Sequence, residues 1–227
     1  MSEQHAPPDG HSEYVYEAPV RLWHWLNAAC IVVLAVTGYF IGVPPPTQPG
    51  EAYDNYLMGY LRFAHFAAGY LFAIGLVGRS YWALVGNHHA RELFWIPLSS
   101  KAYWSDFIAW LRYYLFIGPV PAPIFGHNPL SRFAMVVVFL LTALFMLVTG
   151  FALYGEGAQT GSWQDQLFGW VLPLLGQSNN VHVLHRLGMW LMTLFILLHV
   201  YAALREEICG RLNLIGGIVS GYKSMKK

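Results

Sequence analysis

The sequence predicts an all-α membrane protein, a bundle of four transmembrane helices. Two observations predict this fold class. Only 11% of the 227 residues are charged and 56% are hydrophobic, whereas soluble domains carry about 25% charged residues. Four apolar stretches without Asp, Glu, Lys or Arg are also long enough to cross a bilayer, and they are too long and continuous for barrel strands. A water-soluble enzyme is therefore nearly excluded.

The four predicted spans are separated by loops that differ in length. About 20 apolar residues cross a bilayer, and arginines at helix ends can reach its surface. Three prolines at 44–46 end the first helix. The stretches 101–118 and 163–175 are apolar and aromatic, but one carries charges and the other is short, so we expect interfacial helices there. The spans themselves are predicted at about 22–42, 58–86, 131–155 and 182–205.

The basic residues predict that both termini are cytoplasmic, because Lys and Arg collect on that side of a membrane. With four spans, the opposite side carries only Arg62 and Arg186. We also expect residues 1–13 to be a disordered polar segment and residues 209–227 a basic cytoplasmic tail. The predicted cytoplasmic side carries eleven basic residues: Arg21, Arg79, Arg91, Lys101, Arg112, Arg132, Arg205, Arg211, Lys223, Lys226 and Lys227.

Several classes of protein are excluded by composition. The net charge is +1, which gives no reason to expect a nucleic acid partner. Two cysteines cannot build a disulfide scaffold, and no Cys-x-x-Cys-His motif is present for a covalently attached haem. The polar N-terminal stretch has neither the basic start nor the apolar core of a signal peptide.

Four histidines lie within the predicted spans at two depths. His24 and His199 lie near the cytoplasmic ends, and His65 and His185 near the outer ends. Ionisable residues inside a membrane are costly and suggest a function. His185 and His199 are separated by about 21 Å of helix rise and leave nearly the same face. Imidazoles that face each other at each depth suit bis-histidine b-type haems, so we predict His65–His185 for an outer haem iron and His24–His199 for an inner one.

Other histidines are alternatives to this assignment. His182 competes with His185, but it points about 100° away from His199 along the helix, so we favour His185. His88 and His89 are expected to be solvated in the cytoplasmic loop, with proton transfer or a quinone role as the less favoured alternative. His127, in a Gly-His-Asn-Pro turn, is expected to be structural.

Small residues and arginines near the histidines suit a haem. Gly69 and Gly188 lie one turn from their histidines and leave room for a flat macrocycle. Gly38 and Gly42 are expected to be helix-packing contacts, and no internal repeat is apparent. Arginines can bind propionates, and we expect Arg62 and Arg186 to do so for the outer haem, and Arg21, Arg79 and Arg205 for the inner haem.

Seven stretches of the sequence together form a specific pattern: YVYEAPVRLWHW (14–25), MGYLRFAHF (58–66), GNHHARELF (86–94), GHNPL (126–130), TGFALYGEG (149–157), HRLGMW (185–190) and HVYAALREE (199–207). In these stretches the sequence resembles the cytochrome b subunits of membrane-bound nickel–iron uptake hydrogenases. The resemblance implies a di-haem domain over 14–208 in a bacterial inner membrane, with hydrogenase small and large subunits bound on its outer face. Electrons from hydrogen oxidation would then pass through iron–sulfur clusters and haem b to a quinone.

Three alternatives to this function are considered. The same scaffold could serve another dehydrogenase, such as formate dehydrogenase or thiosulfate reductase. A transporter that uses membrane histidines is disfavoured, because the apolar stretches contain no Asp or Glu. A purely structural anchor for a peripheral enzyme is the third.

A metal site that activates hydrogen would need clustered thiolates, and Cys30 and Cys209 lie far apart in the sequence. We therefore expect an electron-transfer subunit of a hydrogen:quinone oxidoreductase that does not activate hydrogen itself.

Overall fold

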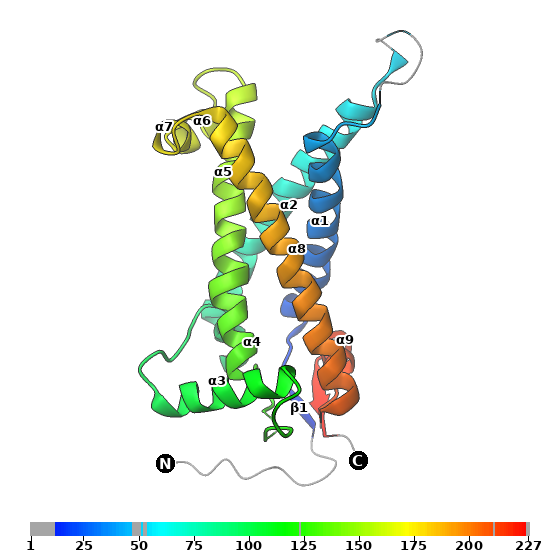
Figure 1. Ribbon diagram of the computed structural model, residues 1–227, viewed down its shortest axis with the longest axis vertical. Helices are drawn as coiled ribbons and strands as arrows, with labels where there is room; N and C mark the ends of the chain where they lie inside the picture. The colour runs from blue at the N-terminus through cyan, green and yellow to red at the C-terminus, as the bar shows by residue number, and fades with distance from the viewer. Residues whose placement is uncertain (1–11, 47–50, 52–53, 123, 211, 226–227) are drawn as a thin grey trace. The chain divides into compact units, whose positions relative to one another are not determined.

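The computed structural model describes residues 12–46, 51, 54–122, 124–210 and 212–225, which are mostly helical, with one pair of short strands (Figure 1). The elements in chain order are β1 (Ser12–Tyr14), α1 (Ala18–Gly42), α2 (Leu57–Val85), η2 (His88–Leu93), α3 (Lys101–Tyr114), α4 (Pro129–Phe133), η3 (Ala134–Leu140), α5 (Leu141–Gly157), α6 (Trp163–Phe168), α7 (Val171–Leu174), α8 (Ser178–Cys209), α9 (Leu214–Ser220) and β2 (Tyr222–Ser224).

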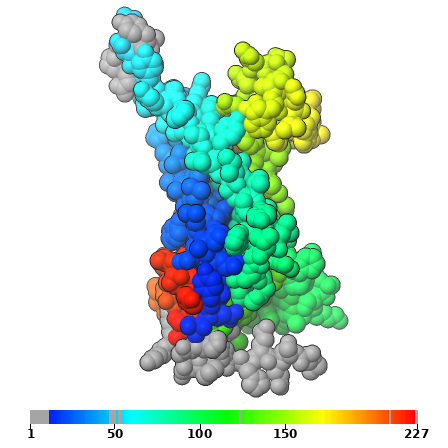
Figure 2. Space-filling view, turned by 180° about the vertical axis from the view of Figure 1, so that it is seen from behind, coloured from blue at the N-terminus to red at the C-terminus, as the bar shows by residue number. Residues whose placement is uncertain are grey.

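Within the described residues, four helices are long and apolar enough to cross a membrane: α1, α2, the run Pro129–Gly157 formed by α4, η3 and α5, and α8. They agree in number and in place with the four predicted spans. The helix α2 lies on the face shown in Figure 2. Its side chains Leu71, Ile74 and Val77 follow one another at a spacing of three and are all exposed. An apolar stripe of this kind is stable against lipid and would be unstable against water.

The chain forms two compact units that each combine distant segments. The terminal unit comprises Met1–Trp23, Arg79–Leu140 and Phe195–Lys227, so it contains both chain ends. The central unit comprises His24–Gly78 and Leu141–Leu194. Each unit is described by itself below.

In the terminal unit the two ends of the chain pair with each other. The strand β1 runs antiparallel to β2, with Glu13 opposite Lys223. Ser12 and Glu13, which we had placed in the disordered segment, therefore belong to a strand, and the rest of that segment lies outside the described residues. The predicted tail contains α9 and β2. Lys223 is almost fully buried, and its Nζ donates to the Gly126 carbonyl at 2.9 Å.

The helix α3 of the terminal unit fills most of the stretch that we predicted as an interfacial helix. Ser100 begins it as an N-cap, where its hydroxyl accepts from the Tyr103 N–H at 3.2 Å. Tyr103 donates its phenol proton to the Pro129 carbonyl at 2.8 Å. These contacts hold α3 against α4 together with a buried aromatic cluster made of Trp110, Tyr113 and Tyr114.

In the central unit the stretch 163–175 folds back against α5 as two short helices, α6 and α7 (Figure 1). Ser162 caps the first of them. Gln164 donates to the Tyr70 hydroxyl at 2.7 Å, which joins α6 to α2. Ala152, Val171 and Val181 form a buried cluster beneath the two helices. The stretch for which we expect an interfacial helix is thus two short helices.

Candidate functional site

The structure brings His65 of α2 and His185 of α8 together in the central unit. Their ring centroids are 6.5 Å apart and their planes are inclined by 69°. Metal–imidazole bonds are about 2 Å long, so two rings that share one ion place their nitrogens about 4 Å apart and their centroids roughly 6 Å apart. The observed separation fits two imidazoles on one iron.

Each of these rings is held by a threonine of a neighbouring helix. The Nδ1 atom of His65 lies 2.9 Å from the Thr37 hydroxyl of α1. The Nδ1 atom of His185 lies 2.8 Å from the Thr149 hydroxyl of α5. Both threonines are buried. Among the described residues no hydrogen bond uses the Nε2 atom of either ring, so this nitrogen is available to a metal ion.

The glycines that leave room for the rings are not the predicted ones. A Cβ atom on Gly38 would lie 3.1 Å from Cε1 of His65, and one on Gly150 would lie 3.3 Å from Cε1 of His185. The nearest atom to a Cβ on Gly69 would be at 3.9 Å, which is ordinary contact. A Cβ on Gly188 would lie 2.5 Å from Met146 Sδ, so this glycine permits α5 and α8 to pack closely.

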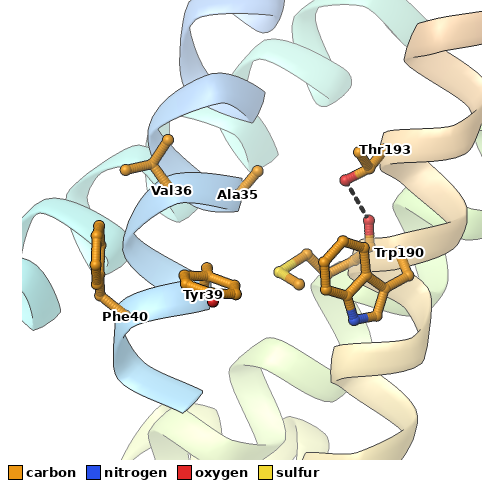
Figure 3. Close-up of a pocket in the computed structure, with 7 residues that line it drawn as sticks. Ala35, Val36, Tyr39, Phe40, Trp190 and Thr193 are labelled. Carbon is orange, nitrogen blue, oxygen red and sulfur yellow. Dashed lines mark hydrogen bonds between the residues drawn. The ribbon is translucent and has the colours of Figure 1, made fainter. Parts of the chain in front are cut away.

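A pocket of about 260 Å³ is lined by residues of α1 and α8 in the central unit (Figure 3). Met189, which lines the pocket, also approaches Gly38: its Sδ atom would lie 3.7 Å from a Cβ there, and Cε1 of His65 would lie 3.1 Å from the same Cβ. In Figure 3, Tyr39 of α1 and Trp190 of α8 lie on opposite sides of the gap. The walls are apolar and aromatic, which suits a flat macrocycle. They comprise Ala35, Val36, Tyr39, Phe40, Met189, Trp190 and Thr193.

His182 lies apart from this arrangement. It is exposed, and its Nδ1 atom lies 3.0 Å from the Ser178 carbonyl in the preceding turn of α8. The geometry therefore favours His185 over His182 as the partner of His65. The two arginines expected beside this pair, Arg62 and Arg186, are both exposed. The Arg186 guanidinium reaches the end of α1, 3.5 Å from where a Cβ on Gly42 would lie.

Comparison with known proteins identifies the family. Residues 15–221 match the family model described as prokaryotic cytochrome b561. The chain belongs to this family. A cytochrome b561 is a multi-pass membrane protein, in agreement with the four apolar helices, and membership implies haem b. The paired imidazoles of His65 and His185 fit that group.

Relatives of this cytochrome carry one name, "Probable Ni/Fe-hydrogenase B-type cytochrome subunit" or its "Ni/Fe-hydrogenase 1" form. One from Cupriavidus necator is 62% identical over 94% of this chain and 87% of its own length. One from Azotobacter vinelandii is 60% identical over 94% and 89%. One from Escherichia coli K12 is 46% identical over 95% and 92%. The resemblance predicted from the sequence is confirmed.

The two other predicted iron ligands of this cytochrome b561 belong to different compact units. The His24 ring, in the central unit, makes an edge contact with Trp25 at 5.0 Å between centroids. The His199 ring, in the terminal unit, stacks on Phe195 at 5.8 Å with the planes inclined by only 16°. Their pairing stays a prediction from the sequence.

Arg79 is the predicted propionate ligand with two unused donors among the described residues, whereas Arg21 and Arg205 each have one, the buried Nε. Its guanidinium is buried in the terminal unit of this cytochrome, 5.6 Å from the Trp23 ring and 5.5 Å from the Phe94 ring. Nη2 donates to the Ala90 carbonyl at 2.6 Å. Nε and Nη1 of Arg79, and Nε1 of Trp23, are buried without a hydrogen-bond partner among the described residues. Buried donors of this kind fit an anion.

Arg21 and Arg205 have partners of their own within the terminal unit. Arg21 donates from Nη1 to the Val219 carbonyl at 2.6 Å, which ties α1 to α9. Arg205 donates from Nη2 to the Tyr113 carbonyl at 2.7 Å and lies 3.8 Å from the Phe116 ring, which ties α8 to the end of α3. These two residues therefore link helices, whatever else they bind.

Glu92 is the centre of a buried network that the sequence did not predict. His89 is buried rather than solvated, with Nε2 3.1 Å from Glu13 and Nδ1 3.1 Å from Glu92. His127 lies 2.6 Å from the second oxygen of Glu92. Together with the exposed His88, Glu13 and His89 could hold a metal ion, but both His89 nitrogens already face carboxylates.

The charges of this network shift the pKa of each member. Burial alone would raise the pKa of Glu92, but bonds from His127 and His89 lower it well below its usual range. Burial lowers the pKa of His89, and the two carboxylates more than reverse this, so its pKa is raised. At His127 burial prevails over the Glu92 interaction and the pKa is lowered. The network therefore contains an ionised Glu92 between two histidines.

Proposed function

We propose that this cytochrome is the haem b membrane-anchor subunit of a respiratory nickel–iron hydrogenase, and that it passes electrons from hydrogen oxidation to the quinone pool. The facing pair His65–His185, with both Nε2 atoms available, is the observation that carries the proposal. The names of the relatives support the hydrogenase over another dehydrogenase as the partner.

The proposal assigns a role to each side chain. His65 and His185 would hold an outer haem, and His24 and His199 an inner one, which gives two haems per chain. Haem b, when bound, supplies reversible one-electron chemistry. The Nε and Nη1 atoms of Arg79, which have no hydrogen-bond partner among the described residues, would bind a propionate of the inner haem. Arg62 and Arg186 would serve the outer haem from the helix ends near its ligands.

The direction of electron flow follows from the proposed orientation. Both termini would be cytoplasmic in a bacterial inner membrane, so the His65–His185 pair would lie toward the outer face. There it would meet the small subunit of the hydrogenase, whose iron–sulfur clusters deliver electrons from the large subunit. The His24–His199 pair would lie toward the cytoplasm, where a quinone accepts the electrons.

Single histidine substitutions test the assignment. We expect His65→Ala and His185→Ala each to remove one of two haems while much of the other is retained, because bis-histidine ligation needs both imidazoles. Haem per chain is measured by pyridine haemochrome on the purified hydrogenase complex, and the difference spectrum shows which haem is lost.

His182→Ala is the matched control on the same helix. We expect it to keep both haems, since its ring is exposed and bonded within α8. Loss of haem from His182→Ala but not from His185→Ala would refute the outer pair. A wild-type complex that contains the chain but no haem would refute the cytochrome function as a whole.

A further inference from the structure

Two helices of the central unit carry the same tripeptide, Val-Thr-Gly, followed by an aromatic residue, against a histidine. In α1 the four residues are Val-Thr-Gly-Tyr at 36–39, and in α5 they are Val-Thr-Gly-Phe at 148–151. In each copy the threonine hydroxyl lies within 2.9 Å of a histidine Nδ1, and the following glycine lies beside Cε1 of the same ring. Each of the two facing imidazoles is thus contacted by the same local arrangement, a threonine hydroxyl at Nδ1 and a glycine beside Cε1.

The direction of each hydrogen bond follows from the helix backbone. Thr37 Oγ1 lies 2.6 Å from the Val33 carbonyl, and Thr149 Oγ1 lies 2.7 Å from the Phe145 carbonyl. A carbonyl can only accept, so each hydroxyl donates its single proton back to the preceding turn. The hydroxyl can then only accept from the histidine. Each imidazole must therefore carry its proton on Nδ1.

This direction decides the tautomer of both rings. A neutral imidazole has one N–H, and the nitrogen without it is the one that can bind a metal ion. With the proton fixed on Nδ1, the lone pair of each ring is on Nε2. The chain backbone, through two threonines, thus keeps both rings in the form that an iron requires.

The glycine after each threonine gives the same imidazole room to approach the helix. Its missing side chain lets the edge of the ring that contains Cε1 approach the backbone of α1 or α5. An alanine would meet Cε1 at 3.1 Å on α1 and 3.3 Å on α5, closer than most carbon contacts. The ring would have to move away from the threonine that holds it.

We propose that Thr37 and Thr149 are the positioning residues of the haem held by His65 and His185. Each hydroxyl fixes the tautomer and the rotation of one axial imidazole, and it does so with a neutral acceptor. A carboxylate in the same place would draw the Nδ1 proton more strongly and make the imidazole a stronger electron donor to iron. The inference rests on the proposed function, since it presupposes a haem between these rings.

The test replaces each hydroxyl by a methyl group of the same size. Thr37→Val and Thr149→Val are compared with Thr37→Ser and Thr149→Ser, which keep the hydroxyl, all in the purified hydrogenase complex. Thr142→Val is the matched control, because Thr142 is also buried on α5 and, unlike Thr37 and Thr149, is not hydrogen-bonded to His65 or His185. The readouts are haem per chain, the midpoint potential of each haem, and the low-spin ferric electron paramagnetic resonance signal, which reports the angle between axial ring planes.

In both valine variants we expect a higher midpoint potential for one haem, because an imidazole without its acceptor stabilises ferric iron less. We also expect a shift of that haem's paramagnetic resonance signal from the wild-type position. Loss of a ligand's outer partner typically weakens metal binding by roughly 10–100-fold, so haem is retained less well on dilution. The serine variants and Thr142→Val should match the wild type.

The outcomes separate this inference from the proposed function. Unchanged potentials and resonance signals in both valine variants, with two haems present, would overturn the role of the threonines and leave the function intact. A wild-type complex without haem would overturn both. If Thr37→Val does not accumulate, Thr37→Ala removes the same hydroxyl and carries the same expectations.

Discussion

Glu92 binds two histidines of the terminal unit with its two oxygens. Its carboxylate can only accept when ionised, as can that of Glu13, so His89 satisfies both only when both its ring nitrogens carry protons. The charged form of His89 therefore stabilises the folded chain. The contact between His89 and Glu13 joins η2, which follows α2, to β1.

This network predicts a pH-dependent difference between the wild type and His89→Gln. A raised histidine pKa gives stability that is fully present below about pH 6.5, the unfolded value, and is lost as pH rises through the folded pKa. Gln keeps a hydrogen bond but no charge. We expect the variant to unfold more easily by about 2 kcal/mol near pH 5.5, the scale of hydrogen bonds to charged groups, and by less at pH 9.

Thermal unfolding in detergent, followed by tryptophan fluorescence, measures this difference. The comparison with the wild type matters, because burial also lowers the pKa of His127 and lowers that of Lys223 to about 8. These two groups favour the fold as pH rises in both proteins. The charge on His89 also lowers the pKa of His127, so the His127 contribution is larger in the wild type than in the variant. A gap between wild type and variant that widens from pH 5.5 to pH 9 would contradict the proposed charge on His89.

Residue-level prediction from the sequence succeeded where spacing carries information. Depth and helix periodicity selected His65 and His185, which the structure places face to face. The same reasoning missed Thr37 and Gly38, because a threonine bonded to its own helix and a small residue both look like ordinary packing. Only their repetition as Val-Thr-Gly on two helices marks them, and we predicted no internal repeat.

At the scale of elements, α1 and α5 approach the histidines through glycine. Gly38→Ala would place a methyl group 3.1 Å from Cε1 of His65. We expect it to displace the ring and weaken haem retention by roughly tenfold, the lower end for lost outer contacts. Gly69→Ala should be neutral, because its methyl group would meet only Leu34 at 3.9 Å. Haem per chain after detergent dialysis distinguishes the two variants.

The opposite order of haem retention in the two variants would support the prediction from the sequence, in which Gly69 leaves room for the macrocycle. If Gly69→Ala loses haem and Gly38→Ala does not, then the macrocycle rather than the imidazole needs the space. Gly188 is unsuited to this comparison, because a methyl group there would clash with Met146 at 2.5 Å and would disturb the packing of α5 against α8.

Elements were predicted as well as their local signals allowed. Long apolar runs fixed α1, α2 and α8, and aromatic composition fixed α3. The strands β1 and β2 were not predicted, because a strand of three residues shows no periodicity and the two strands lie far apart in the sequence. Only tertiary contacts, such as the burial of Lys223, specify that pairing.

At the scale of the whole molecule, four apolar helices together with the uneven distribution of basic residues predict the orientation. Eleven Lys and Arg are assigned to one side and two to the other, and positive residues favour the cytoplasm. A fifth span at α3 would reverse the C-terminal end. The hydrogen bond from Tyr103 to Pro129 and the N-cap at Ser100 show α3 as a helix packed on α4.

Reporter fusions test this orientation in the bacterial cell. We expect alkaline phosphatase to be active after Glu51 and after Ser162, since both positions follow an odd number of spans. It should be inactive after Ser99 and at the C-terminus, where green fluorescent protein should fluoresce instead. The fusion at Ala122 decides the status of α3, because it stays cytoplasmic only if α3 does not cross. Active phosphatase at the C-terminus would place the basic tail outside the cytoplasm. That result would contradict the proposed orientation and the proposed entry of electrons through the His65–His185 pair.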